Sequence, residues 1–387
     1  MPTGKPCTLS EFTAECSDLS GDKAGLLAVG FNARLVACCA RSILFLTNDT
    51  SAWMFSLLNV FSWCRAGTGQ SHEMPTIFHR LSTISQMLLH PYFVFDGPDC
   101  PQIKRGKDIL GWSPPSLLVQ RFQELLTAFG FDWHVAPGEA EAELSCLQSC
   151  GFIDAMVTPY DDALLFGATC VFHSICGDED VEVYSAEAIE NSASLEWGDL
   201  LLITLMSSAD SDVSTTGCRW CNTDVAHWLV DYGFGRTLLE AAISLQFVEF
   251  MEFVAKWCDN ICEVLRTDPQ HFLGHRYHEL ARVIKEEHFE FPDPAILAMY
   301  LSPLTSWSDG GHSPITCVTS RQPNLTALAA FCSQRLGWPP DTVQSALMDA
   351  CAGAAMRALL QVSFAIMPNI LIPSHHPPYA AARQHRW

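Results

Sequence analysis

Between residues 42 and 175 the chain alternates short apolar runs with longer stretches in which apolar residues recur every three or four positions. The first pattern is typical of buried strands, and the second is typical of helices that cover them. The apolar runs predict strands at 42–48, 92–95, 133–136, 153–158 and 170–175. Strands that alternate with helices in this way indicate an α/β fold with a parallel sheet covered on both faces.

Two helices are predicted inside this region. One begins at Pro114-Pro115 and ends before Gly130, and its apolar face consists of Leu118, Phe122, Leu125, Leu126 and Phe129. The other begins at Gly138 and carries Glu139 and Glu141. From residue 199 onward the pattern is mostly helical, with helices predicted at 200–207, 247–265 and 294–301.

Acidic residues gather at the predicted strand ends. Asp49 and Asp96 follow two strands directly, and the segment 160–162 follows a third. Parallel sheets bind ligands beyond the carboxyl ends of their strands, so these residues indicate one shared site. Carboxylates that are held close together repel each other, and divalent cations with oxygen ligands relieve that repulsion.

The composition narrows the class of protein. With 387 residues, 49% of them hydrophobic, the chain can bury a sizeable core and is not expected to be disordered. No signal peptide is visible at the start, and no uninterrupted run of ~20 apolar residues occurs, so we expect an intracellular protein without a membrane span. Seventeen cysteines in such a chain favour reduced thiols over disulfides.

The net charge is −21, from 22 basic and 43 acidic residues. This balance argues against a protein that coats nucleic acid indiscriminately, because phosphate binding needs clustered Lys and Arg. Lys104, Arg105 and Lys107 form the densest basic cluster. Because the cluster lies directly after residues 93–98, with Asp96 among them, we interpret it as a phosphate contact and not as a solvated loop.

Two blocks of sequence resemble motifs of a known family. Residues 136–143, which read Ala-Pro-Gly-Glu-Ala-Glu-Ala-Glu, resemble together with 157–168 the internal nuclease motif of the flap endonuclease/XPG superfamily. Residues 93–98 and 102–107 resemble the end of its N-terminal nuclease motif. Farther along, 291–294 and 321–339 resemble the segment after the nuclease core in the Holliday-junction-resolving branch.

The resemblance implies a PIN-like nuclease core with a central parallel twisted sheet, followed by a helical helix-hairpin-helix region. The implied division is a nuclease core at 1–198, a DNA-docking region at 199–245, a helical C-terminal region at 246–360 and a flexible tail at 361–387. The implied activity is that of a structure-specific DNA endonuclease, which hydrolyses phosphodiesters in flap or junction DNA during repair or recombination. Such an enzyme uses two Mg²⁺ or Mn²⁺ ions, binds branched DNA and is expected in the nucleus.

The resemblance also implies the site residues. The metal ligands would be an Asp after the first strand, followed by Asp96, Glu139, Glu141, Asp162 and Asp210. For the first Asp there are two candidates: Asp49, which has the better upstream strand, and the position of Asn32. Lys104 would contact the scissile phosphate and act with Asp96 and Glu141 in catalysis, and further DNA contacts would come from Arg105, Lys107 and Gly217.

Two positions depart from the family pattern. Tyr160 stands where the family has an Asp two residues before Asp162, and a tyrosine with a pKa of ~10 is a poor Mg²⁺ ligand at neutral pH. Water can fill such a vacancy, so we expect the second metal site to be weakened and not lost. Arg219 stands where the helix-hairpin-helix turn has a second glycine, which weakens the expected duplex anchor.

Two other functions stay open. The first is a family member that binds branched DNA or a repair partner but cleaves slowly or not at all. Tyr160 and Arg219 favour it, whereas the remaining acidic set disfavours it, because a protein that only binds gains nothing from carboxylates near phosphate. The second is a ribonuclease on the related sheet fold, which cleavage of single-stranded RNA would reveal.

Overall fold

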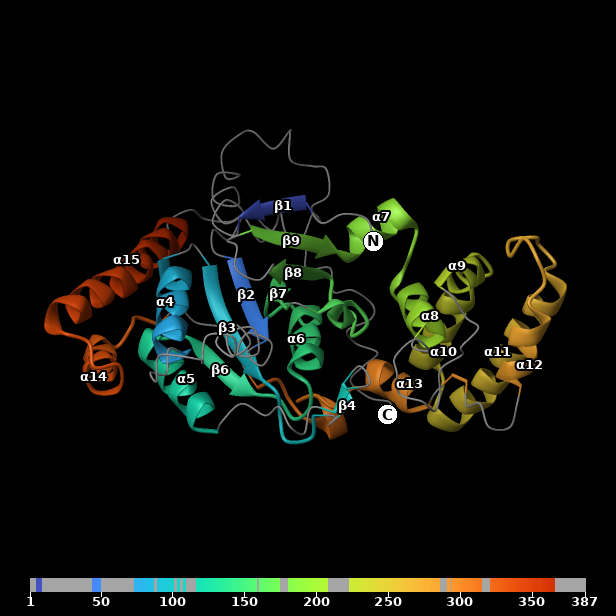
Figure 1. The fold of residues 1–387 in the computed structure, drawn as a ribbon, viewed down its shortest axis with the longest axis horizontal. Helices are drawn as coiled ribbons and strands as arrows, with labels where there is room; N and C mark the ends of the chain where they lie inside the picture. The colour runs from blue at the N-terminus through green and yellow to red at the C-terminus, as the bar shows by residue number, and fades with distance from the viewer. Residues whose placement is uncertain are drawn as a thin grey trace, which may run out of the picture.

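The computed structural model describes residues 5–8, 44–49, 73–86, 89–100, 103–104, 107–108, 116–158, 160–174, 180–207, 223–285, 291–292, 294–314 and 321–365. These residues form a central sheet with helices on both of its faces and a further group of helices to one side (Figure 1). Several predicted positions lie outside the described residues, namely Asn32, Arg105, Asp210, Gly217 and Arg219.

The main sheet has seven strands in the order β1-β9-β8-β7-β2-β3-β6. Its five neighbouring parallel strands are β8 (Cys170–Ser174), β7 (Ala155–Val157), β2 (Leu44–Asp49), β3 (Leu89–Phe95) and β6 (Asp132–Val135). β9 (Asp180–Ser185) and β1 (Lys5–Thr8) extend it with antiparallel pairings. The predicted α/β class and the five parallel strands are confirmed, whereas the antiparallel edge was not predicted.

Strand β3 shows why both faces of this sheet are covered. Successive side chains of a strand point to opposite faces. Phe93 and Phe95 belong to one apolar core, which is completed by α4 (Glu73–Gln86), α5 (Ser116–Phe129), α14 (Leu325–Arg335) and α15 (Pro340–Ala365). Tyr92 and Val94 belong to a second core, formed with α6 (Ala140–Ser149) and α7 (Ala186–Ala193).

A third core lies among the helices that follow the sheet, on the right of Figure 1. These are α8 (Trp197–Ser207), α9 (Thr223–Asp231), α10 (Phe234–Ser244), α11 (Phe247–Thr267), α12 (His278–Ile284) and α13 (Pro294–Leu301). Helices α8 and α10 approach closely at two glycines, since a Cβ on Gly235 would lie 2.6 Å from the carbonyl oxygen of Gly198. This core also includes Ala142 of α6, a helix that packs against the sheet.

The last described element reaches past one expected domain boundary, and the division into domains stays a prediction. Helix α15 continues to Ala365, so it crosses the boundary at 360 where a flexible tail was expected to begin. The rest of that tail, 366–387, lies outside the described residues, as does the part 208–222 of the DNA-docking region expected at 199–245. Among the described helices, none is both long and apolar enough to cross a membrane.

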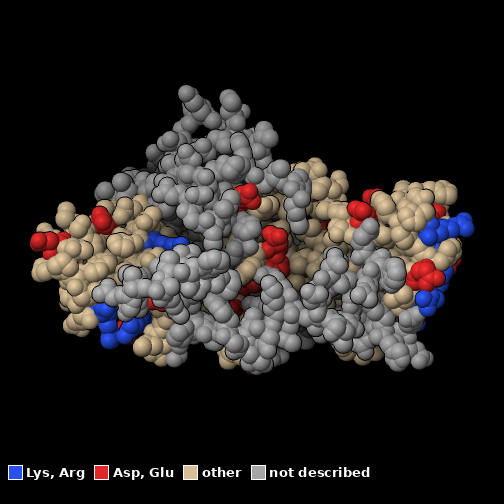
Figure 2. Space-filling model, viewed as in Figure 1, with Lys and Arg blue, Asp and Glu red and all other residues tan. Residues whose placement is uncertain are grey.

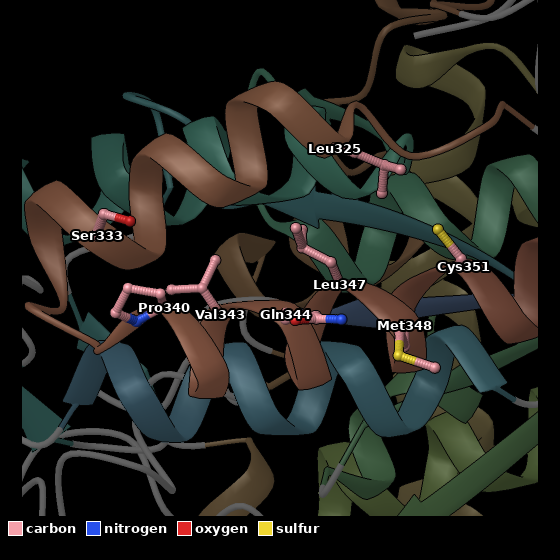
Figure 3. A pocket seen from close by; sticks show the side chains of 8 residues that line it. All are labelled: Leu325, Ser333, Pro340, Val343, Gln344, Leu347, Met348 and Cys351. Atoms are coloured by element: carbon pink, nitrogen blue, oxygen red, sulfur yellow. The ribbon is translucent and has the colours of Figure 1, made fainter.

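Two hollows occur on the helical side that carries α14. One of about 450 Å³ lies between α14 and α15 and is mostly apolar, with Leu325, Val343, Leu347, Met348 and Cys351 among its lining residues (Figure 3). The other, of about 710 Å³, lies between α5 and α14. Neither of these two hollows is lined by a residue that the sequence predicts in the site.

Candidate active site

Three parallel strands bring the predicted acidic positions to one edge of the sheet. Asp49 is the last residue of β2 and pairs in register with Val94 of β3, so the backbone at Asp49 lies beside the segment that leads to Asp96. On the other side of β2, Asn48 pairs with Val157, the last residue of β7. The prediction that the strand ends converge on one edge is therefore confirmed for the backbone.

The loop after β3 packs tightly against the turn that starts α6. The backbone N–H of Gly97 donates to the carbonyl oxygen of Gly138 at 2.8 Å, and that of Asp99 donates to Pro137 at 3.2 Å. A Cβ on Gly97 would overlap the carbonyl oxygen of Ala136, so no larger residue fits there. The glycine of the Asp96-Gly97-Pro98 segment thus lets two distant stretches of chain meet.

Asp96 caps α6 from this loop. Its Oδ1 accepts a hydrogen bond from the backbone N–H of Ala140, the first residue of the helix, at 2.9 Å. Glu139 occupies the N-cap position itself, and its side chain makes no capping hydrogen bond. An anionic side chain at a helix N-terminus is stabilised by the helix dipole and by the unpaired N–H groups. Asp96 therefore has a structural contact in addition to its predicted catalytic role.

The two glutamates predicted as ligands are both buried at the start of α6. The exposed fraction is 8% for Glu139 and 1% for Glu141. The hydroxyl of Thr158, the first residue after β7, donates to Oε1 of Glu141 at 3.2 Å and accepts from the backbone N–H of Tyr160 at 3.3 Å. Thr158 therefore connects α6 to the segment that begins at Tyr160, the position where the sequence departs from the family pattern.

That segment continues as a short 3₁₀ helix, η1 (Asp161–Leu164). Tyr160 precedes it as its N-cap residue in extended conformation and is half-buried. Asp161 is exposed, and Asp162 is half-buried in the first turn. The pair at i and i+2 thus consists of one phenol and one carboxylate, and its first member is linked to Glu141 through the Thr158 hydroxyl.

A third glutamate of the same helix was missed by the sequence analysis. Glu143 is fully buried, and its Oε1 lies 3.1 Å from Nε2 of His134 on β6. Its Oε2 accepts a hydrogen bond from the backbone N–H of Ser306 at 2.8 Å. No signal in the sequence indicated this burial, because a residue two positions after Glu141 lies on the opposite side of the helix, where a solvated glutamate is expected.

The chemistry of the predicted donor set suits Mg²⁺ or Mn²⁺, which prefer carboxylate oxygens. Asp96, Glu139 and Glu141 all lie at the first turn of α6. Within the part of the chain that the structure describes, no three His, Cys, Asp or Glu side chains converge closely enough to hold a metal ion. Figure 2 shows acidic side chains near the middle of the face drawn there, whereas the visible Lys and Arg side chains lie away from it.

The predicted DNA contacts begin on a small hairpin after the Asp96 loop. Strands β4 (Ile103–Lys104) and β5 (Lys107–Asp108) pair antiparallel, and Lys104 lies directly opposite Lys107. Arg105 falls between them, outside the described residues, as do Asp210 and Gly217 farther along. The backbone therefore places the two lysines of the basic cluster next to each other.

Comparison with protein families and relatives points in one direction. Residues 130–212 match the model of the XPG I-region. The flap endonuclease GEN-like 1 of Arabidopsis thaliana is 32% identical over 165 residues, which are 36% of this chain and 28% of that protein. The DNA repair protein RAD2 of Saccharomyces cerevisiae is 30% identical over 94 residues, which are 24% of this chain and 9% of that protein. The chain thus aligns with less than a third of either relative's length.

Solved structures show the same likeness in the fold. The Holliday junction-resolving enzyme GEN1, in complex with product DNA and Mg²⁺, is similar with a TM-score of 0.66 and 22% identity over 93% of this chain and 78% of that chain. The catalytic core of Rad2 in complex with DNA substrate is similar with a TM-score of 0.56 and 21% identity over 80% of this chain and 94% of that chain. The resemblance expected from the sequence is thereby confirmed: residues 130–212 match the XPG I-region, and the relatives that align with the chain include a flap endonuclease and a DNA repair protein.

Proposed function

We propose that the chain is a divalent-metal-dependent endonuclease that cleaves flap or junction DNA. The observation that carries this proposal is the start of α6, where Glu139 and Glu141 are buried and two other strand ends contact the same turn through Asp96 and Thr158. Burying carboxylates costs free energy that hydrogen bonds offset only in part, and carboxylates held close together repel, so their concentration at a sheet edge favours a functional reason. The relatives with flap endonuclease and DNA repair names agree with this reading.

In this proposal, Asp96, Glu139, Glu141 and Asp162 hold Mg²⁺ or Mn²⁺ together with Asp49 and Asp210. Two such ions, when bound, supply an activated water and stabilise charge on a phosphodiester. Lys104 contacts the scissile phosphate, where its charge stabilises the transition state. Arg105, Lys107 and the backbone at Gly217 bind the DNA backbone.

Tyr160 attenuates the activity in this proposal, because the second ion lacks a ligand at that position. Two contacts support this interpretation. Tyr160 is half-buried and its backbone N–H bonds the hydroxyl of Thr158, and the same hydroxyl donates to Glu141. The names of the relatives as DNA repair proteins favour a nuclear location.

A second candidate function is binding without cleavage. Besides Tyr160 and Arg219, one observation of the structure favours it: no three potential ligands converge among the described residues. In that case the chain would bind branched DNA or a repair partner through the same fold, and its acidic residues would have no role in turnover.

The deciding experiment compares cleavage of labelled 5′-flap DNA, four-way-junction DNA and single-stranded RNA, each with Mg²⁺, with Mn²⁺ and with EDTA. We expect metal-dependent cleavage of one or both branched DNAs and none of the RNA. Asp96→Asn keeps an oxygen that can cap Ala140 but removes the charge, so it should stop cleavage without unfolding the protein. Asp99→Asn, an exposed change in the same loop, is the matched control and should cleave at the wild-type rate. Metal-independent cleavage, or binding without cleavage by the wild type, would contradict the proposal.

A further inference from the structure

The three glutamates of the Glu-Ala repeat have different surroundings although they lie two residues apart. Glu139 precedes α6, Glu141 faces Thr158, and Glu143 faces His134 and Ser306. Residues two apart on a helix are rotated by about 200°, so Glu141 and Glu143 point to opposite sides of α6. Glu143 therefore does not share the predicted metal site, and its complete burial needs another explanation.

Glu143 is the end of a continuous chain of hydrogen bonds. The Tyr92 hydroxyl lies 2.7 Å from Nδ1 of His134, and Nε2 of His134 lies 3.1 Å from Glu143. Burial raises the pKa of the Tyr92 phenol far above its ordinary value, and the charges of Asp132 and Glu143 add to the effect. A neutral phenol donates to Nδ1, which leaves the imidazole proton on Nε2, where it is donated to Glu143. Every donor in the chain is thus satisfied.

The other carboxylate oxygen of Glu143 bonds a loop that lies about 160 residues later in the sequence. Residues 302–311 follow α13, and the N–H of Ser306 donates to Oε2 of Glu143. The same loop touches the residue before Glu139, since a Cβ on Gly138 would lie 2.8 Å from the carbonyl oxygen of Leu304. The loop is braced internally by a hydrogen bond from Thr305 to Ser308 and another from Ser308 to Thr305, at 3.0 and 2.9 Å.

We propose that Glu143 is a positioning residue, which fixes the first turn of α6 between β6 and the 302–311 loop and so sets the direction of Glu139 and Glu141. This inference rests on the proposed function, in which Glu139 and Glu141 are metal ligands. The buried carboxylate of Glu143 links three elements that are distant in sequence. His134 of β6 and Ser306 of the loop bond it directly, and Tyr92 of β3 is linked to it through His134. A helix held on both sides at the same turn cannot rotate, so its ligands keep a single geometry.

The experiment measures Mn²⁺ affinity by calorimetry, in the absence of DNA, on the full chain. Glu143→Gln keeps one oxygen for Ser306 but presents an NH₂ group or a weaker acceptor to His134, and Glu143→Leu removes both contacts. Outer-shell partners of metal ligands are worth about 10- to 100-fold in metal affinity or activity. We expect the Mn²⁺ dissociation constant to rise by about 10-fold in Glu143→Gln and by up to about 100-fold in Glu143→Leu.

The matched control is Gln148→Leu at the other end of α6. Gln148 is buried and makes three hydrogen bonds, to Asp154, Cys170 and Thr169, at 2.8 to 3.0 Å. Its loss should lower the urea midpoint of unfolding as much as the loss of Glu143 does, but it should leave Mn²⁺ affinity unchanged. Equal shifts of Mn²⁺ affinity in both leucine variants would show that Glu143 only stabilises the helix, and would overturn the inference.

The outcomes also separate this inference from the proposed function. Glu143→Gln is the milder change and should stay folded. If its Mn²⁺ affinity equals that of the wild type, the positioning role is overturned and the nuclease proposal stays intact. A wild type that binds Mn²⁺ but does not cleave branched DNA overturns the nuclease proposal, while the ratio of the dissociation constants still decides the role of Glu143. A wild type that binds no Mn²⁺ overturns the positioning role together with the metal site.

Discussion

Helices α5 and α6 cover opposite faces of the same strand, β3, but they bury different chemistry. The buried positions of α5 are apolar: Phe122 packs against Phe93 and Phe95, and Phe129 belongs to the same core. Helix α6 buries every residue from 140 to 148, and this set includes Glu141, Glu143, Ser145 and Gln148. The same strand thus has one face built from aromatic rings and another built partly from carboxylates and amides.

The difference between the two helices separates stability from function. Burying an apolar side chain such as Phe contributes roughly 1.5–3 kcal/mol, whereas a buried carboxylate costs free energy that its hydrogen bonds only partly offset. A chain under no other constraint would fill both faces in the way that α5 does. Gln148 holds neighbouring backbone groups through its hydrogen bonds. In the proposed function, the buried carboxylate of Glu141 is explained by chemistry at the edge of the sheet, and the apolar face provides the stability that tolerates it.

The largest expected effect on stability comes from breaking the apolar face. Phe122→Ala, at a fully buried position, should lower the free energy of unfolding by about 3–5 kcal/mol, because it removes the ring and leaves a cavity. Leu117→Ala on the same helix is the control, since Leu117 is 55% exposed and surface changes of this kind stay within about 0.5 kcal/mol. Urea unfolding measures both. The cleavage rate per folded molecule should stay at the wild-type value.

That prediction fails in two ways. A loss of less than about 1 kcal/mol in Phe122→Ala would mean that the α5 face does not carry the stability assigned to it. A cleavage rate that falls while the protein stays fully folded would mean that the two faces are coupled. The claim that α5 provides stability and α6 provides function would then be wrong.

The next effect concerns the face of the sheet that α6 covers, where one more carboxylate should raise the cleavage rate. Tyr160→Asp restores a pair at i and i+2 with Asp162, so cleavage should increase most at low Mg²⁺, where occupancy of the second site limits the rate. Adding Asp162→Asn should erase the gain, because the two carboxylates act as a unit. The measurement is the cleavage rate against Mg²⁺ concentration for the wild type and both variants.

A competing account has the site rebuilt around the Tyr160 ring. In that case the new Asp would be an unpaired acid among other acids, and it would destabilise the fold without raising turnover. A curve that does not shift to lower Mg²⁺, combined with no gain in rate, would refute the idea of a missing ligand.

The smallest effect should come from the basic hairpin. Replacing Lys104, Arg105 and Lys107 with Ala should flatten the slope of log affinity against log salt by about 0.9 for each phosphate contact that is lost. Arg335→Ala, an exposed change on α14, should leave the slope unchanged. If the triple variant keeps the wild-type slope, the hairpin is a solvated loop and the DNA follows another path.

Much of the sheet could be predicted from local patterns. The apolar runs located all five parallel strands, although β3 begins at Leu89 and not at Tyr92, because His90 and Pro91 interrupt the apolar run. Helix α4 was not predicted even though Met74, Ile77, Phe78 and Leu81 have helical spacing. The pairing of β9 with β1 joins residues about 175 positions apart, which no local pattern encodes.

The candidate site was predictable only in part, for a related reason. Asp49, Asp96 and the 160–162 segment could be assigned to one edge because topology places the ends of parallel strands together. The partners of these residues could not be predicted, because they depend on contacts across the fold. Thr158 meets Glu141 across 17 residues, and Ser306 meets Glu143 across 163.

The most direct test of the central claim uses Glu141→Gln, which replaces a buried carboxylate of α6 with an amide that can still accept from Thr158. Two quantities are measured on one preparation: the rate of branched-DNA cleavage in saturating Mn²⁺ and the free energy of unfolding in EDTA. The account predicts that cleavage falls by at least about 100-fold while the free energy of unfolding stays the same or rises, because a charge leaves a crowded acidic site. Wild-type cleavage by the folded variant would contradict the account.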